Sequence, residues 1–104
     1  MKKAELIGNL TEDVKVEEVK GKGGKATQVA KITLACDGIA KDDTAFIRIT
    51  VWEKQAVNLA KHCGTKGSKL YVEANIATNN YEKDGVKHYG FDFTANRIEY
   101  LSKK

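Results

Sequence analysis

Five segments of this chain alternate between apolar and polar residues with a period of two, and turn-forming residues separate them. This alternation is typical of β-strands that bury one face. Proline is absent from the 104 residues, so no proline ring interrupts a strand ladder. The pattern therefore predicts an all-β fold. Strands are expected over residues 3–19, with interruptions near Gly8-Asn9 and Glu12-Asp13, over 25–36, 44–52 and 69–78, and from the Lys83-Asp84-Gly85 turn to Leu101.

One further segment repeats with helical spacing. Ala56, Leu59, Ala60 and Cys63 fall on one face of a helix predicted over residues 53–63, and Gly64 follows as a C-terminal stop. The order is thus three strands, one helix and two strands. It matches the OB-fold, a five-stranded, partly open Greek-key barrel with its helix between strands 3 and 4. We expect one such domain over residues 1–104.

The charge balance favours a polyanionic partner. The net charge is +4 and the sequence pI is about 9.0, which favours nucleic acid over an acidic membrane or protein surface. Lysine supplies nearly all of the positive charge, because Arg48 and Arg97 are the only arginines. Lysine is better suited to point contacts with phosphates than to reading base edges.

Other classes of function receive little support. The carboxylates are spread over turns and edges without a nucleophile–base arrangement, so we expect no enzyme and no small-molecule substrate. His62-Cys63 offers two ligands, too few for a closed zinc site, so neither a metal nor a cofactor is expected. The two cysteines are isolated, no apolar run follows Met1-Lys2-Lys3-Ala4, and no stretch reaches the length of a membrane span. These features predict an intracellular, cytoplasmic protein without a membrane partner.

The strand over residues 44–52 has two different faces. Bases stack on aromatic side chains for about 1–3 kcal/mol each, whatever their identity, and a nearby guanidinium can hold a phosphate. Two large aromatics around a cation are unusual on a solvated face, so this strand predicts binding of single-stranded nucleic acid. Ala45, Ile47, Ile49 and Val51 form the inward face, and Phe46, Arg48, Thr50 and Trp52 form the other.

Further candidates lie in two predicted hairpins. Tyr81 stands at the entry to a hairpin that also carries Lys83 and Lys87, and the glycine-rich turn near residue 23 carries Lys22 and Lys25, which we expect to contact phosphates. An alternative stays open for the aromatic residues, which would instead pack beneath a loop, against the helix or against another subunit. Trp52 is the most ambiguous of them, because it adjoins the predicted helix start.

Three parts of the chain resemble bacterial single-stranded DNA-binding proteins, the SSB family. They are Leu6-Ile7-Gly8-Asn9-Leu10, the Phe46 to Trp52 strand, and Lys66-Gly67-Ser68-Lys69-Leu70-Tyr71-Val72-Glu73. The resemblance covers nearly the whole chain. It implies an OB-fold that assembles as a homo-oligomer, usually a homotetramer and otherwise a dimer, and that wraps single-stranded DNA. The family's stacking aromatics fall on Phe46, Trp52 and Tyr81, and its strand arginine falls on Arg48.

Several positions depart from the family pattern. Ala77, Asn79 and Asn80 replace basic residues, which should weaken the electrostatic hold on DNA, and the usual Asp-Pro is Asp13-Val14. The loop over residues 37–43 is short and lacks a stacking aromatic. The chain ends at Ser102-Lys103-Lys104, without the family's acidic tail, so either that tail was removed or the chain is a short natural form, and tail-mediated recruitment is not expected.

The expected function is binding and protection of single-stranded DNA with little sequence preference, in replication, recombination or repair near the nucleoid. Stacking on Phe46, Trp52 and Tyr81 and phosphate contacts from Arg48 and the lysines would provide it. Two alternatives stay open. One is an OB-fold that binds RNA, since stacking does not discriminate the sugars. The other is a primosome-type protein-interaction module whose aromatic face is covered by another protein.

Overall fold

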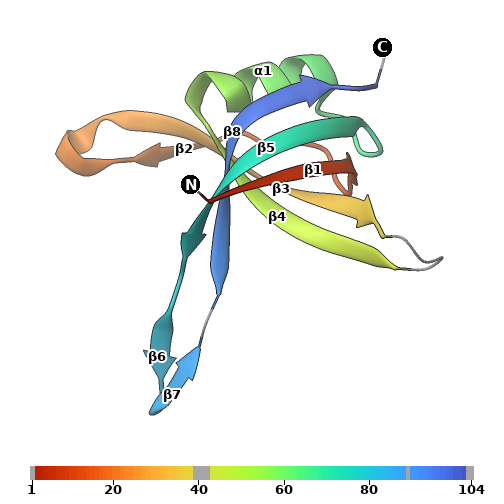
Figure 1. Ribbon diagram of the computed structural model, residues 1–104. Helices are drawn as coiled ribbons and strands as arrows, with labels where there is room; N and C mark the ends of the chain where they lie inside the picture. The colour runs from red at the N-terminus through yellow and green to blue at the C-terminus, as the bar shows by residue number, and fades with distance from the viewer. Residues whose placement is uncertain (1, 39–42, 89, 103–104) are drawn as a thin grey trace.

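A curled sheet with one helix against it forms the body of the protein (Figure 1). The computed structural model describes residues 2–38, 43–88 and 90–102. Within them the six-stranded sheet has the order β1-β5-β8-β4-β3-β2, and a second sheet pairs β6 with β7. The elements are β1 (Lys3–Leu10), β2 (Glu17–Lys20), a short 3-10 turn (Lys22–Gly24), β3 (Ala26–Asp37), β4 (Thr44–Trp52), α1 (Glu53–Cys63), β5 (Lys69–Thr78), β6 (Tyr81–Lys83), β7 (Val86–His88) and β8 (Phe91–Tyr100).

Strand β1 closes the barrel because it pairs on both of its edges. It runs antiparallel to β5 along most of its length, and its last residues, Asn9 and Leu10, pair with Ala35 and Leu34 of β3. Gly8 makes this crossing possible, since a Cβ atom at that position would lie 2.7 Å from the Ala35 carbonyl oxygen. The opposite side closes through β4 and β8, which run parallel. The predicted OB-fold with a five-stranded barrel is confirmed.

The core lies between the inner faces of the strands and α1. Its largest fully buried side chains come from β3, β4, α1 and β5. Burial of an aliphatic side chain of this size stabilises the fold by about 1.5–3 kcal/mol. Ala56, Leu59 and Cys63 are the buried residues of α1, as its spacing predicts, and Ala60 is half-buried. The largest fully buried side chains are Leu34, Ile49, Val51, Leu59, Cys63, Leu70 and Val72.

The segment predicted over residues 3–19 forms two strands: the interruption predicted near Glu12-Asp13 is confirmed, whereas β1 runs unbroken through Gly8-Asn9. Strand β1 ends at Leu10 and a separate strand, β2, begins at Glu17. Between them the backbone amides leave the ladder: Thr11 donates to the Thr33 carbonyl at 3.1 Å and Val14 to the Gly64 carbonyl at 2.7 Å. These long-range bonds carry the chain across the end of the barrel before it pairs again, with β3.

The inward face predicted for β4 is left uncovered at one of its four residues. Ile49 and Val51 are buried and Ile47 is half-buried, whereas Ala45 is exposed. The cause is that β4 extends with β3 beyond the buried residues of the core, which leaves Ala45 exposed on the inner face.

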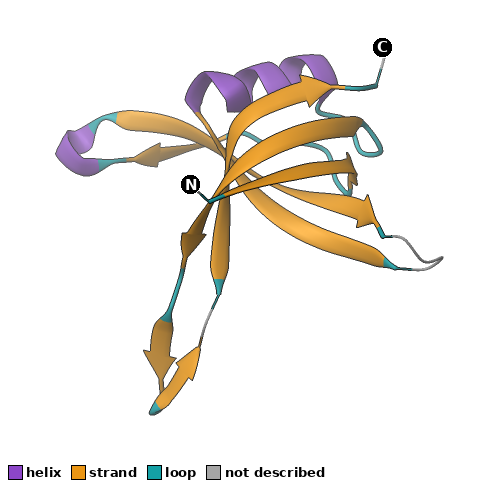
Figure 2. Cartoon of the chain, in the orientation of Figure 1, coloured by secondary structure: helices purple, strands orange, loops and turns teal. Residues whose placement is uncertain are grey.

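Two hairpin arms project from the barrel in different directions (Figure 2). The first, here called the β2–β3 arm, consists of β2, the 3-10 turn and the start of β3. The second, the β6–β7 arm, follows β5 and precedes β8, so the predicted fifth segment is divided into β7 and β8. No helix in the described residues is long and apolar enough to cross a membrane.

Candidate nucleic-acid interface

The outer face of β4 presents aromatic and cationic side chains to solvent. Phe46 is 68% exposed and Trp52 43% exposed, and Arg48 is exposed between them. Strand alternation places all three side chains on one face, and six residues at about 3.3 Å each separate the aromatics by roughly 20 Å. The alternative that these aromatics pack beneath a loop or the helix is wrong for the described chain.

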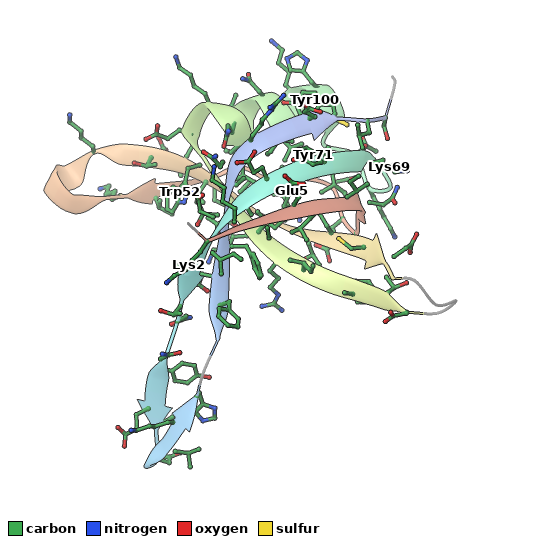
Figure 3. All side chains as sticks on the ribbon, viewed as in Figure 1. Lys2, Glu5, Trp52, Lys69, Tyr71 and Tyr100 are labelled. Atoms are coloured by element: carbon green, nitrogen blue, oxygen red, sulfur yellow. The ribbon has the colours of Figure 1, made fainter. Side chains whose placement is uncertain are left out.

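Trp52 stands where β4 changes into α1. It has extended backbone angles, and the next residue, Glu53, has φ of 54°, a left-handed value that residues other than glycine rarely adopt. This sharp turn starts the helix immediately after the strand. Figure 3 shows Trp52 near the root of the β2–β3 arm, consistent with the pairing of Trp52 with Val29 of β3.

A hollow of about 370 Å³ lies beside Arg48, between β4 and β8. Thr50 is paired with Lys31 of β3 on one side and with Thr94 of β8 on the other, so these residues share the outer surface around the hollow. The hollow is lined by Lys31, Arg48, Ile49, Thr50, Phe91, Asp92 and Phe93.

Lys31 and Phe91 are among the residues of this hollow that the sequence pattern did not identify as candidates. Phe91 is 66% exposed, nearly as much as Phe46. A signal for Lys31 existed, because its position on β3 falls on the same face as Arg48 once the β3–β4 hairpin is set in register. Phe91 had no such signal. Strand alternation places it on the same face as Phe93, which is half-buried against the core, and therefore does not predict that Phe91 is exposed.

The β6–β7 arm carries Tyr81, Lys83 and Lys87, all exposed. Tyr81 stacks on His88, its cross-strand partner, with ring centroids 4.9 Å apart and an interplanar angle of 12°. One face of the tyrosine ring is therefore occupied, although the side chain is 54% exposed. Glu82 and Asp84 offset the two lysines, so these four residues together carry no net charge.

The β2–β3 arm carries the other predicted lysines. Lys25 follows the 3-10 turn and is exposed. The Lys22 side chain lies outside what the structure describes. The structure therefore places the candidate residues in three groups rather than one cluster: Phe46, Arg48 and Trp52 on the barrel, Tyr81, Lys83 and Lys87 on one arm, and Lys25 on the other.

The ion pairs of the described residues lie away from this face. Lys3 Nζ is 2.9 Å from Glu73 Oε1, and Arg97 pairs with Glu99. Neither Arg48 nor Lys31 belongs to these pairs, so within the described chain their charges are available to an external anion.

The described residues contain no group of three His, Cys, Asp or Glu side chains placed to hold a metal ion. Burial, together with the Asp37 charge, raises the pKa of the Cys36 thiol, which keeps the thiol protonated near neutral pH.

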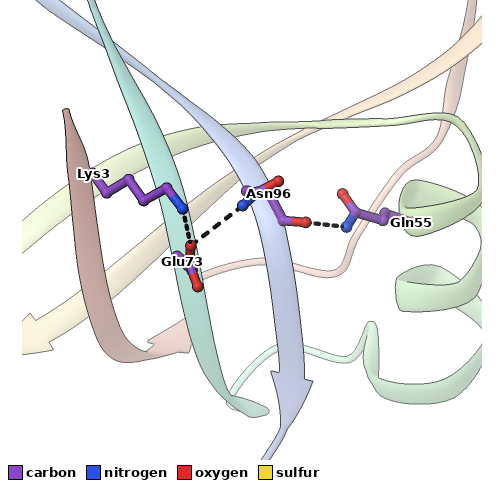
Figure 4. Close-up of polar contacts among 4 residues, drawn as sticks. All are labelled: Lys3, Gln55, Glu73 and Asn96. Atoms are coloured by element: carbon purple, nitrogen blue, oxygen red, sulfur yellow. Dashed lines mark hydrogen bonds and ion pairs between the residues drawn. The ribbon is translucent and has the colours of Figure 1, made fainter. Parts of the chain in front are cut away.

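A polar network connects β1, β5, β8 and α1 on the other side of the barrel (Figure 4). Glu73 Oε1 accepts hydrogen bonds from Lys3 and, at 3.3 Å, from Asn96 Nδ2, and the Gln55 amide donates to the Asn96 carbonyl at 2.8 Å. The hydrogen bond from Lys3 and then that from Asn96 hold the pKa of Glu73 below its ordinary value. Figure 3 shows Glu5 and Tyr71 on the same outer surface, and burial followed by the charges of Glu5 and Glu73 raises the pKa of Tyr71.

The fold and the exposed aromatic and cationic face define a small OB-fold binding protein. A solved structure with the same architecture is that of the mitochondrial single-stranded DNA-binding protein Rim1 from S. cerevisiae, with a TM-score of 0.77, 23% identity, and coverage of 99% of this chain and 97% of that one. At this identity the likeness concerns the fold.

Sequence comparison gives the family. The chain belongs to the Single-strand binding protein family, whose sequence profile matches residues 1–101. It is 38% identical to single-stranded DNA-binding protein 3 of Clostridium acetobutylicum, over 97% of this chain and 71% of that protein. It is 35% identical to the single-stranded DNA-binding protein of Clostridium perfringens, over 97% of this chain and 66% of that protein. Membership of this family makes the chain a binding protein rather than an enzyme.

Proposed function

We propose that this chain binds single-stranded DNA with little sequence preference, through stacking of bases on exposed aromatics and through phosphate contacts with lysine and arginine. The observation that carries the proposal is the outer face of β4, where Phe46 and Trp52 stand exposed on either side of Arg48. Every base offers a π-face, so stacking on such a surface tolerates any sequence.

The path we propose for the strand runs over the barrel face and along the arms. Phe46, Arg48 and Trp52 form its centre, Lys25 flanks it on the β2–β3 arm, and Tyr81 with Lys83 and Lys87 extends it on the β6–β7 arm. Lys22 belongs to this set by its place in the sequence. The acidic residues of the β6–β7 arm offset its lysines, so most of the electrostatic hold comes from the barrel and the β2–β3 arm.

We also propose that residues 1–104 act as one domain in a homo-oligomer, a tetramer or a dimer. Ile7 on β1 is 52% exposed and is paired with Tyr71 of β5, so the two side chains share one outer face, which supports a contact between copies there. We propose further that it acts on cytoplasmic DNA near the nucleoid, in replication, recombination or repair; its bacterial relatives carry the name single-stranded DNA-binding protein. Light scattering at several protein concentrations measures the oligomeric state, and a monomer throughout would contradict this part.

The experiment that tests the main proposal uses Trp52, the one tryptophan of the chain. Titration with an oligothymidylate should quench its fluorescence, and the affinity should fall as the salt concentration rises, because binding releases counterions from the phosphates. A matched oligouridylate competitor tests the RNA alternative. Absence of binding to both at low salt would contradict nucleic-acid binding and favour a protein partner on the aromatic face.

A further inference from the structure

We infer that the hollow between β4 and β8 is a nucleotide subsite in which a base of the bound strand stacks on Phe91. This inference rests on the function proposed above and adds to it a fourth stacking residue. It also gives Lys31 a role beside Arg48. None of the three groups of candidate residues described above includes the hollow's β8 wall.

The shape of the hollow follows from the way two strands separate. Strands β4 and β8 are parallel and are paired at Thr50 and Thr94. On the N-terminal side of this pair, β4 runs on beside β3 while β8 runs towards the β6–β7 arm, so the strands form a fork (Figure 1). The hollow lies in this fork, and its volume of about 370 Å³ is within the range of small-ligand sites, about 300–1,000 Å³.

Phe91 is exposed because its strand continues beyond the barrel. Strand alternation puts it on the same face as Phe93, which packs against the core, but two residues further towards the arm. There it pairs with Thr78, near the end of β5, and no core remains to cover it. A large aromatic ring with two thirds of its surface exposed, beside a hollow, offers a base the stacking surface that Phe46 offers on β4.

The two walls of the hollow differ in charge. The β3–β4 wall carries Lys31 and Arg48, while the β8 wall carries Phe91 and Asp92. The Asp92 carboxylate accepts a hydrogen bond from Asn79 Nδ2 at 3.4 Å. A nucleotide in the hollow would therefore place its phosphate towards Lys31 and Arg48 and its base against Phe91.

The position of Phe91 also connects two groups that are otherwise separate. It lies at the base of the β6–β7 arm, where the Asn79 amide donates to the Gly90 carbonyl at 2.8 Å, and Tyr81 follows two residues after Asn79. Arg48 lies across the hollow on the barrel face. A strand that passes through the hollow can thus contact the barrel face and the arm in succession.

The test moves the tryptophan reporter to the subsite. In a Trp52→Phe background, Phe91→Trp places the sole tryptophan in the hollow, and binding of a dye-labelled oligothymidylate is followed in parallel by anisotropy. We expect quenching of the residue-91 fluorescence as the oligonucleotide binds. The control is Tyr100→Trp in the same background, about 30 Å further along β8 and near His62 of α1, which should not be quenched.

A second measurement uses affinity alone. Phe91→Ala should weaken binding by about five- to 150-fold, the range that corresponds to the loss of one stacked base, whereas Phe91→Tyr should stay within about twofold of the wild type. Leu101→Ala, an exposed apolar residue beyond the far end of β8, is the matched control and should not change the affinity.

The outcomes separate the two levels of the proposal. Failure of the wild-type protein to bind any oligonucleotide would remove the proposed function itself. Wild-type binding with quenched Trp52 but an unquenched tryptophan at residue 91, or with a Phe91→Ala affinity within about twofold of the wild type, would overturn the subsite alone.

Discussion

Lys3 Nζ on β1 lies 2.9 Å from Glu73 Oε1 on β5, and this ion pair adjoins the irregularity in the pairing of β5 with β8 after Glu73. Because the hydrogen bonds from Lys3 and Asn96 favour the charged carboxylate, they lower the pKa of Glu73 in the folded state. The network joins the strand that closes the barrel to the strand beside it, and its contribution to stability depends on pH.

A depressed carboxyl pKa stabilises the fold above the unfolded value, and that stabilisation is lost as the pH falls through the folded value. Glu73→Gln should therefore lower the melting temperature at neutral pH, and the difference from the wild type should shrink once the pH falls below the ordinary value of 4.5. Thermal melts between about pH 7 and pH 3 measure this. In a Lys3→Met background the effect of Glu73→Gln should be smaller at neutral pH, and an equal effect would argue against the pair.

Gly8→Ala should destabilise the barrel by about 1–3 kcal/mol, because the new methyl group would be forced against the Ala35 carbonyl and the Cys36 sulfur at the β1–β3 crossing. Denaturant unfolding measures the loss. Gly21→Ala is the matched control, since a Cβ atom there meets its nearest neighbour at an ordinary 3.7 Å and the residue has φ of −85°. Equal stabilities for the two variants would contradict close packing at the crossing.

At position 53 we expect glycine to be more favourable than alanine, which is the reverse of their usual order of helix propensity. Alanine is ordinarily about 1 kcal/mol more favourable than glycine within a helix. At φ of 54°, however, a side chain costs roughly 1–2 kcal/mol that glycine avoids. Both Glu53→Gly and Glu53→Ala remove the carboxylate from the first helical turn, so the two variants differ mainly in this term. Chemical denaturation should find Glu53→Gly the more stable, and the opposite order would count against the left-handed turn.

The two arginines provide a matched pair for the electrostatics of binding. Arg48→Gln should weaken binding and reduce the slope of log affinity against log salt by about 0.7, the value for one phosphate contact on a single strand. Arg97→Gln should leave the slope unchanged, because Arg97 pairs with Glu99 away from the β4 face. Fluorescence titrations at four or more salt concentrations measure the slopes. A larger change for Arg97 than for Arg48 would place the strand on a different surface.

The stacking residues on β4 should each contribute to affinity without supporting the core. Phe46→Ala and Trp52→Ala should each weaken oligothymidylate binding by about five- to 150-fold, since one stacked base is worth about 1–3 kcal/mol. Their unfolding free energies should change little, because both side chains are exposed. Anisotropy with a labelled oligonucleotide measures the affinity, and unchanged affinity in both variants would exclude stacking on this face.

The local pattern of apolar, polar and turn residues was sufficient to predict the elements around the β4 face. Strand β4, helix α1 and strand β5 begin and end at the predicted residues, because their alternation or helical spacing coincides with turn residues at each end. The exposed positions of Phe46, Arg48 and Trp52 also follow from a period of two. Their role in binding DNA stays a prediction.

Where the fold depended on distant contacts, the sequence pattern misled. Val14 and Val16 keep the alternation of a strand because both pack against the core, yet they lie between β1 and β2. Phe91 and Phe93 have the same pattern as two buried residues, and only the end of the barrel decides that one is covered and the other is not. No local signal marks that end, since it is set by where β4 and β8 separate.

The β6–β7 arm affects how far the protein reaches and not how its core packs. The β6–β7 arm is an antiparallel ladder of three residue pairs that stands outside the core, so its length is not constrained by the packing of the barrel. Adding or removing one residue in each of β6 and β7 would change which face the side chains beyond that point present, whereas two in each would preserve it. The length of single-stranded DNA that one copy covers could therefore be changed in steps of two residues per strand of the arm, with the barrel left intact.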